Sequence, residues 1–174
     1  MVRFPNVETL AKANLDDVLK YWEGLGYYRR ARHLHEAAKQ IIDDYNGVFP
    51  KDYNAILKLK GVGEYTAGAI HSIAFNQPTP AIDGNVLRVL SRVTCYQEDI
   101  GKSESVKRFK DLLQATIIHE IPRDFTQAMM ELGALVCKKK PECALCPLKE
   151  HCLAYQTHTQ NDYQVKKSKQ AANL

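Results

Sequence analysis

The sequence lacks any apolar run that approaches the ~18 residues needed by a membrane-spanning helix. Its first residues, MVRFPNVETL, also lack the apolar core of a secretory signal peptide. Both absences argue against a membrane protein or a secreted one. We therefore expect a cytoplasmic protein that makes no contact with a membrane.

Strand-type alternation of apolar and polar residues is missing as well, and no segment repeats. Instead, apolar residues recur at helical spacing along a chain of 174 residues that is 45% hydrophobic and 25% charged, as in folded domains. We predict an all-α fold of about eight helices. Residues of capping type predict where four of these helices start, and they are Asn14, Asp52, Ser103 and Asp124.

Most of the chain lacks a net charge, because the first 136 residues are neutral overall. Residues 137–174 contain seven lysines and three acidic residues, so this segment alone accounts for the net charge of +4. A basic end of this kind indicates a polyanionic partner. For Lys166, Lys167 and Lys169 a solvated tail is the alternative interpretation.

A glycine turn, Lys60-Gly61-Val62-Gly63-Glu64, separates two segments of helix-spaced apolar residues, so a helical hairpin is predicted at about residues 54–75. The two glycines permit positive φ and leave backbone N–H groups uncovered. Together with the free donors at the start of the second helix, these groups can bind an anion such as a nucleic-acid phosphate. An ordinary corner between two helices is the alternative.

Asp83 precedes a helical stripe that begins at Val86, and the prolines before it exclude a continuous helix. The commonest role of aspartate at this position is to cap the helix. The other interpretation is a carboxylate that the helix dipole stabilises and that points into a cleft.

A second glycine turn, Gly24-Leu25-Gly26, leads into Tyr27-Tyr28-Arg29-Arg30. Aromatic rings can stack on bases or wedge between them, and arginines can meet phosphates, so this segment suits a nucleic-acid surface. The alternative is a helix start whose tyrosines pack into the core.

Four of the five cysteines cluster as C-x5-C-x2-C-x5-C, and they are Cys137, Cys143, Cys146 and Cys152. In a cytoplasmic chain, this clustering indicates a metal centre rather than disulfides, and four thiolates suit either zinc or an iron–sulfur cluster. Cys95 is left over, and we expect a buried thiol there. The loop between the first two cysteines carries Lys138, Lys139 and Lys140, which a rigid metal site would present to a phosphate backbone.

Five segments in order, GLGYYRRARHL, LKGVGEYTAGAI, AIDGNVLRVLSR, FTQAMMELGALVC and CALCPLKEHC, resemble the helix-hairpin-helix DNA glycosylases that carry an iron–sulfur cluster. Within that superfamily the chain is most similar to the adenine-specific glycosylases, the MutY family. The resemblance covers almost all of residues 1–170. It implies the helix-hairpin-helix glycosylase fold with a C-terminal iron–sulfur cluster loop.

The resemblance implies a base-excision repair enzyme that flips adenine, mispaired with 8-oxoguanine or guanine, out of duplex DNA and removes it. Asp83 then stabilises the oxocarbenium-like cation, and Tyr27 wedges into the duplex. The hairpin positions that match phosphate contacts are Gly61, Val62 and Gly63. The positions that match the substrate pocket are Tyr65, Asn85, Gln127 and Glu131. The four clustered cysteines match the ligands of a [4Fe-4S] cluster.

Tyr65 separates two branches of the superfamily. The related endonuclease III enzymes carry a lysine here that forms a Schiff base, and a phenol cannot form an imine. We therefore expect a monofunctional glycosylase.

Three features depart from the family pattern, and one of them is that the chain ends at Leu174, around where the family has a linker to a C-terminal domain that reads 8-oxoguanine. Nothing in the N-terminal segment FPNVETLAKANLDD matches the family's catalytic glutamate, the general acid that protonates adenine, so we expect a fragment truncated at both ends with weak or no activity of its own. The first cysteine loop is also one residue shorter than is usual. The alternative is a non-catalytic, DNA-binding iron–sulfur or zinc module.

The expected organisation is a helical domain in residues 1–136, a cluster loop in 137–152 and a polar tail or linker in 153–174. We expect a monomer, associated with the bacterial nucleoid through its DNA.

Overall fold

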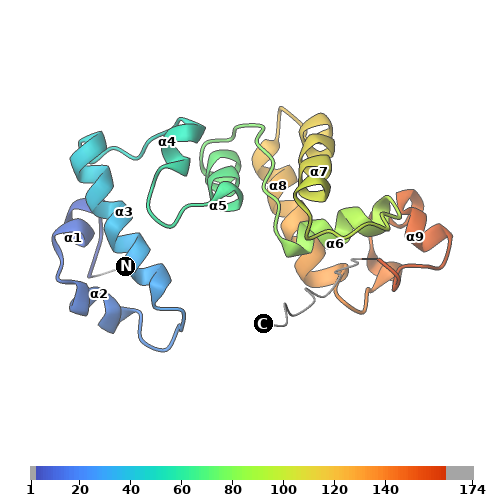
Figure 1. The fold of residues 1–174 in the computed structure, drawn as a ribbon, viewed down its shortest axis with the longest axis horizontal. Helices are drawn as coiled ribbons and strands as arrows, with labels where there is room; N and C mark the ends of the chain where they lie inside the picture. Colours follow the sequence, from blue (N-terminus) through green and yellow to red (C-terminus); the bar gives the residue numbers. More distant parts are fainter. Residues whose placement is uncertain (1–2, 164–174) are drawn as a thin grey trace, which may run out of the picture. The chain divides into compact units, whose positions relative to one another are not determined.

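The computed structural model describes residues 3–163. Its contacts divide the chain into two compact units, Met1–Ala67 and Gly68–Leu174, which are described separately. Among the described residues there are nine α-helices, with short π-helical and 3-10 turns and no strand (Figure 1). The predicted all-α fold is therefore confirmed. Within the described residues, no helix has both the length and the apolar character required to cross a bilayer.

The first unit is built around one long helix, α3. The helices assigned here are α1 (Val7–Lys12), α2 (Leu15–Tyr21), α3 (Arg29–Tyr45), α4 (Tyr53–Leu57) and α5 (Glu64–Ala69), which runs past Ala67. Both α1 and α2 pack against α3 (Figure 1). A small core forms where the buried Ala37 and Ile41 of α3 meet Leu59 from the turn after α4. This core therefore connects α3 to the glycine hairpin.

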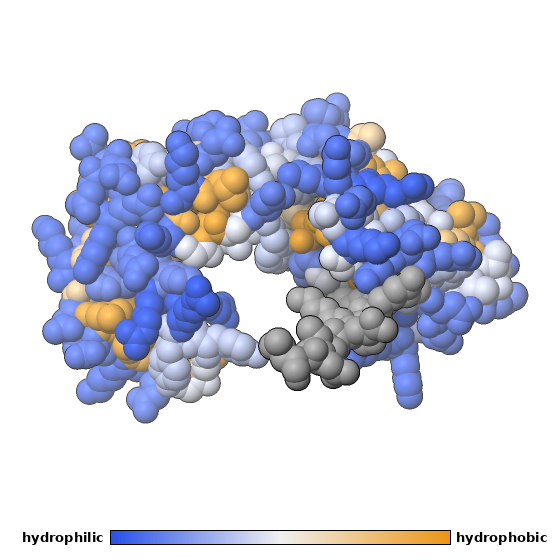
Figure 2. Space-filling view, viewed as in Figure 1, coloured by the Kyte–Doolittle hydropathy of each residue, from blue (hydrophilic) through white to orange (hydrophobic). Residues whose placement is uncertain are grey.

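An apolar groove also lies on the first unit. Its exposed members include Tyr21, Leu25 and Leu34, of which Leu25 keeps 65% of its surface accessible. In Figure 2, hydrophobic residues reach the surface of this unit between hydrophilic ones.

The second unit surrounds α6. Its elements are a π-helical turn (Ile70–Ala74), α6 (Gly84–Val93), α7 (Ser103–Thr116), α8 (Pro122–Glu131), a second π-helical turn (Leu132–Val136), 3-10 turns (Cys143–Leu145 and Lys149–His151) and α9 (Leu153–Gln156). The buried residues that form its core are Val86, Leu90, Ile100, Phe109 and Leu113. Because α7, α8 and α9 all contact α6, this helix is held in place, and so are the residues at its N-terminus.

Two of the four predicted caps are confirmed. The side chain of Asn14 accepts a hydrogen bond from Asp16 N, and that of Asp52 accepts one from Ala55 N. The other two predictions are wrong. Lys102, not Ser103, holds the N-cap position of α7, and α8 starts at Pro122, a residue suited to the first helical position. Asp124 therefore lies in the first turn of α8 rather than before it.

Residues 137–152 belong to the second unit, and α9 follows them and packs on α6. Residues 153–156 of the expected tail are thus helical. Lys166, Lys167 and Lys169 lie outside the described residues. The division at residues 136 and 152 stays a prediction about domains.

Candidate active site and nucleic-acid interface

Asp83 is the N-cap of α6, and its carboxylate is held by three donors. Oδ1 accepts from the backbone N–H groups of Asn85 (2.9 Å) and Val86 (2.8 Å), and Oδ2 accepts from Asn85 Nδ2 (3.1 Å). A carboxylate offers about four acceptor sites. The capping interpretation is therefore confirmed, and one acceptor site on Oδ2 remains for a ligand.

Arg88 extends this arrangement into the protein. It is 9% exposed. Its Nη2 donates to Asn85 Oδ1 (2.9 Å) and to Gly133 O (2.6 Å), and its Nε donates to Cys137 O (2.7 Å). A continuous chain of hydrogen bonds thus leads from Asp83 through Asn85 and Arg88 to the first clustered cysteine.

Two glycines allow the backbone to pack closely around the Asp83 segment. A Cβ at Gly133, in the second π-helical turn, would lie 2.7 Å from Asn85 Cβ. A Cβ at Gly68 would lie 2.4 Å from Pro80 O, in the segment that leads to Asp83. Any side chain at either position would push the segment aside, so both glycines help to define where Asp83 lies.

The four clustered cysteines line one pocket together with Arg92. Burial raises the pKa of the Cys143 thiol, and the neighbouring Cys137, Cys146 and Cys152 raise it further, so the sulfur atoms lie close enough to interact. Burial also raises the pKa of Cys146. Four soft donors around one pocket fit a thiolate-bound group. Cys95 is only half-buried, so the prediction of a buried thiol is wrong.

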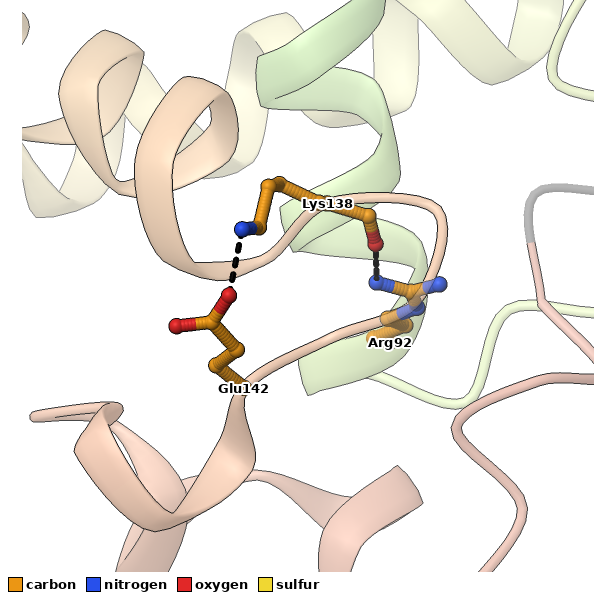
Figure 3. Close-up of polar contacts among 3 residues, drawn as sticks. All are labelled: Arg92, Lys138 and Glu142. Atoms are coloured by element: carbon orange, nitrogen blue, oxygen red, sulfur yellow. Dashed lines mark hydrogen bonds and ion pairs between the residues drawn. The ribbon is translucent and has the colours of Figure 1, made fainter.

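Arg92 shapes the loop between the first two cysteines. Its guanidinium donates to Cys137 Sγ (3.3 Å), Lys138 O (2.6 Å) and Lys139 O (3.0 Å), the second of which is drawn in Figure 3. The ammonium group of Lys138 pairs with Glu142 across the same loop (Figure 3). Lys139 and Lys140 are exposed and form no ion pair with another described residue. These two lysines are therefore the exposed charges of the loop that have no ion-pair partner among the described residues.

The hairpin turn between α4 and α5 presents two open amides. Gly61 has a φ of +74°, and Val62 N donates to Leu59 O (3.1 Å) inside the turn. Within the described residues, the amides of Gly61 and Gly63 donate no hydrogen bond. A Cβ at Gly63 would meet nothing within 4 Å. An anion can therefore approach this face of the turn closely, and its donors there would be the two glycine amides rather than that of Val62.

Tyr27 projects from the loop before α3. Its side chain is 83% exposed and its φ is +48°, which is uncommon outside glycine. Trp22 Nε1 donates to Gly26 O (2.9 Å), and the Arg30 guanidinium stacks over the Trp22 ring. Tyr28 is also exposed, at 44%. The alternative that the tyrosines pack into the core is therefore wrong.

Gln127 and Glu131, two more of the expected pocket residues, bind each other. Gln127 Nε2 donates to Glu131 Oε1 (2.7 Å) in an exposed pair on α8. No hydrogen bond among the described residues joins this pair to Asp83 or Asn85. Tyr65 is 42% exposed on α5 and belongs to the first unit, whereas Asp83 belongs to the second.

Sequence reasoning missed Arg88 and Arg92. They are the charged residues of the segment VLRVLSR, spaced i and i+4, so they share one face of a helix that is otherwise apolar. A charged pair on a mostly buried helix is a signal that could have identified them, because buried charges require partners.

Comparison with known proteins agrees with this geometry. Residues 1–115 match the model of the HhH-GPD superfamily of base excision DNA repair proteins. The chain is 42% identical over 172 residues to an adenine DNA glycosylase of Buchnera aphidicola, which covers 96% of this chain and 47% of the relative. It is 42% identical over 158 residues to the human adenine DNA glycosylase, covering 90% of this chain and 29% of the relative. It therefore spans about half or less of these relatives.

Solved structures give the same result. A thermostable thymine-DNA glycosylase superposes with a TM-score of 0.77 at 29% identity, covering 90% of this chain and 72% of that one. A trapped endonuclease III–DNA covalent intermediate superposes with a TM-score of 0.75 at 28% identity, covering 90% and 73%. The helical hairpin with open amides, the helix capped by Asp83 and these matches lead to one conclusion: the chain belongs to the HhH-GPD superfamily of base excision DNA repair proteins.

Proposed function

We propose that the chain is the part of an adenine-specific DNA glycosylase that grips duplex DNA and carries the carboxylate next to the reacting sugar. The observation that carries this proposal is Asp83, whose carboxylate is fixed by three hydrogen bonds and keeps one acceptor site. The names of the relatives support adenine as the base.

The chemistry assigns Asp83 an electrostatic role. A base inside a duplex cannot be reached, so adenine is first flipped out of the stack. Cleavage of the glycosidic bond leaves both bonding electrons on adenine and positive charge on the sugar, and water then adds to the sugar. A fixed carboxylate beside the sugar stabilises that charge without having to reorganise. Protonation of adenine requires a general acid, a role that we assign to no described residue.

The reaction ends with base removal in this proposal. Tyr65 occupies the position at which the related endonuclease III enzymes carry a lysine. A phenol forms no imine with the sugar. We therefore propose a monofunctional enzyme.

The proposed partner is double-stranded DNA with an A·8-oxoguanine or A·G mispair, bound by a monomer. The amides of Gly61 and Gly63 would bind phosphate, Tyr27 would enter the duplex, and Lys139 and Lys140 would lie along the backbone. A repair enzyme works where its DNA is, which for a bacterial chain is the nucleoid in the cytoplasm.

The proposed cofactor is a [4Fe-4S] cluster held by Cys137, Cys143, Cys146 and Cys152. Among residues 3–163, no group of three or more His, Cys, Asp or Glu side chains is arranged so that it could hold a single metal ion. A cluster binds each thiolate through a different iron, so its sulfurs are spaced more widely than those around one zinc. When bound, the cluster would hold the lysine loop rigid.

Replacing Cys146 with serine is expected to reduce bound iron and sulfide to a small fraction of wild type, because one thiolate ligand is lost. Cys95→Ser is the matched control, since Cys95 lies outside the pocket. Iron and sulfide analysis of anaerobically purified protein measures both. Equal iron in the two variants would contradict the ligand assignment.

The role of Asp83 can be measured without the general acid. Two duplexes are compared, in which a cationic pyrrolidine nucleotide or an uncharged tetrahydrofuran nucleotide stands opposite 8-oxoguanine. We expect wild type to bind the cationic duplex about tenfold more tightly, since a nearby opposite charge at intermediate dielectric stabilises the cation by at least ~1.4 kcal/mol. Asp83→Asn should remove this preference, because the amide keeps the shape and loses the charge.

The outcomes distinguish a glycosylase site from a non-catalytic DNA-binding module. Preference for the cation that disappears in Asp83→Asn supports a glycosylase site. Binding of both duplexes with equal affinity by wild type would reject the role of Asp83 and favour a non-catalytic DNA-binding module. Adenine release from an A·8-oxoguanine duplex in single-turnover experiments, absent in Asp83→Asn, would add direct evidence for the reaction.

A further inference from the structure

One face of α3 forms the support on which the hairpin turn lies. His33, Ala37, Gln40 and Ile41 share that face, because positions i, i+4, i+7 and i+8 align on a helix. Leu59, which is 3% exposed, packs against Ala37 and Ile41. The turn is thus anchored to α3 by one buried side chain just before Lys60.

Gln40 adds two polar contacts around that anchor. Its Nε2 donates to Lys58 O (3.2 Å), and its Oε1 accepts from Lys60 N (3.1 Å). The side-chain amide therefore pairs with the backbone groups on either side of Leu59. Only asparagine and glutamine carry such a donor and acceptor together, and asparagine is one methylene shorter.

A third contact lies on the other side of Lys60. A Cβ at Gly61 would lie 2.5 Å from His33 Cβ, so the backbone of the turn rests directly on α3. The turn is therefore fixed at Lys58, Leu59, Lys60 and Gly61, immediately before the open amide of Gly63.

We infer that Gln40 is a positioning residue for the phosphate-binding turn, and that it aims the Gly61 and Gly63 amides at the DNA backbone without touching DNA. This inference rests on the proposed function. With Gln40 in place, Lys60 N is committed to α3, and the peptide units that follow are oriented outward. Without it, Leu59 and the packing of Gly61 on His33 still anchor the turn, but Lys60 N loses its acceptor and the amides of Gly61 and Gly63 are held less firmly.

The experiment measures binding of undamaged duplex DNA by the full chain at several salt concentrations. Gln40→Leu is expected to weaken binding about tenfold, as for the loss of one good contact. It should also lower the slope of log K against log salt by about 0.9, the value for one phosphate contact. Gln40 is uncharged, so a change in slope reports on the turn and not on the lost side chain itself.

Further variants separate positioning from general stability. Gln40→Met keeps the aliphatic stem and should behave like Gln40→Leu. Gln40→Glu keeps the acceptor for Lys60 N but places an oxygen against Lys58 O. This variant should therefore bind DNA at least as weakly as Gln40→Leu. Gln114→Leu is the matched control, because Gln114 Nε2 donates to Pro78 O (2.9 Å) on the other unit. That variant should keep wild-type affinity and slope.

Hydrogen exchange gives a readout that needs no DNA. The amide of Lys60 should exchange faster in Gln40→Met than in wild type, since its acceptor is gone, while the unfolding midpoint changes little. Unchanged exchange of Lys60 would overturn the inference.

The failure of the inference differs from that of the proposed function. If Gly63→Asp weakens DNA binding while Gln40→Met keeps the wild-type slope, the inference is overturned and the DNA-binding turn stands. A weaker affinity with an unchanged slope overturns it too, because that result means general destabilisation. If wild type itself does not bind duplex DNA, both the inference and the proposed function fall.

Discussion

Replacing Arg88 with methionine is expected to lower the free energy of unfolding by about 3–5 kcal/mol. The substitution removes the Arg88 donor from the carbonyls of Gly133 and Cys137, of which the second keeps only a long contact to Arg92 Nη1 (3.4 Å), and a buried carbonyl without a donor costs about 1–3 kcal/mol. Methionine fills a similar volume, so the effect is polar rather than one of packing. Urea unfolding followed by circular dichroism measures it.

Two variants control this measurement. Arg123→Met removes a guanidinium whose Nε donates to Ile73 O (2.6 Å) at an exposed site, where water replaces the lost donor, so a change of less than ~1 kcal/mol is expected. Arg88→Lys keeps the charge, but a single ammonium group cannot reproduce the planar fork of donors, and an intermediate loss is expected. Equal unfolding midpoints for Arg88→Met and Arg123→Met would contradict the role given to Arg88.

Arg88→Met should also affect Asp83, which Arg88 reaches only through Asn85. Asn85 Nδ2 donates to Asp83 Oδ2, and Arg88 holds the other end of the same amide. Loss of Arg88 frees Asn85 to rotate, and the preference for a cationic sugar analogue should shrink although Asp83 is present. A folded Arg88→Met protein with the full wild-type preference would show that Asp83 is oriented by the helix N-terminus alone.

Local features of the fold were predictable from the sequence because they depend on near neighbours. The start of α6 at Asp83 and the caps at Asn14 and Asp52 follow from residues within one helical turn. The same reasoning failed at Asp124, because Pro122 is compatible with the first helical position and moves the start of α8 forward.

Distant pairs were not predictable. Arg88 and Cys137 are 49 residues apart, and Gln40 and Lys60 are 20 apart. The sequence gives the capacity of each side chain to form hydrogen bonds but not its partner, since partners are chosen by packing of whole helices. Gly133 illustrates the limit: its place in a π-helical turn, where only a hydrogen fits beside Asn85, depends on a contact that no local pattern contains.

Replacing Gly63 with aspartate is expected to weaken binding of duplex DNA on the order of 100-fold while the protein stays as stable as wild type. Gly63 O accepts the first hydrogen bond of α5, from Ala67 N, so this residue occupies the position where aspartate caps a helix well. Its φ is not positive and a Cβ meets nothing within 4 Å, so the side chain fits. At the face proposed to meet phosphate, however, the new charge repels DNA by roughly 4 kcal/mol at ~4 Å before screening by salt.

Gly63→Asn is the matched control, because asparagine has nearly the same shape and caps helices equally well but carries no charge. It should bind DNA within about tenfold of wild type, and the difference between the two variants should shrink as salt rises. Binding by fluorescence anisotropy and stability by urea unfolding separate the two effects. Gly61→Ala should instead destabilise the turn itself, because Gly61 has a φ of +74° and a Cβ there would collide with His33. If Gly63→Asp and Gly63→Asn bind DNA equally, the turn does not face a phosphate, and its glycines serve only the corner between α4 and α5.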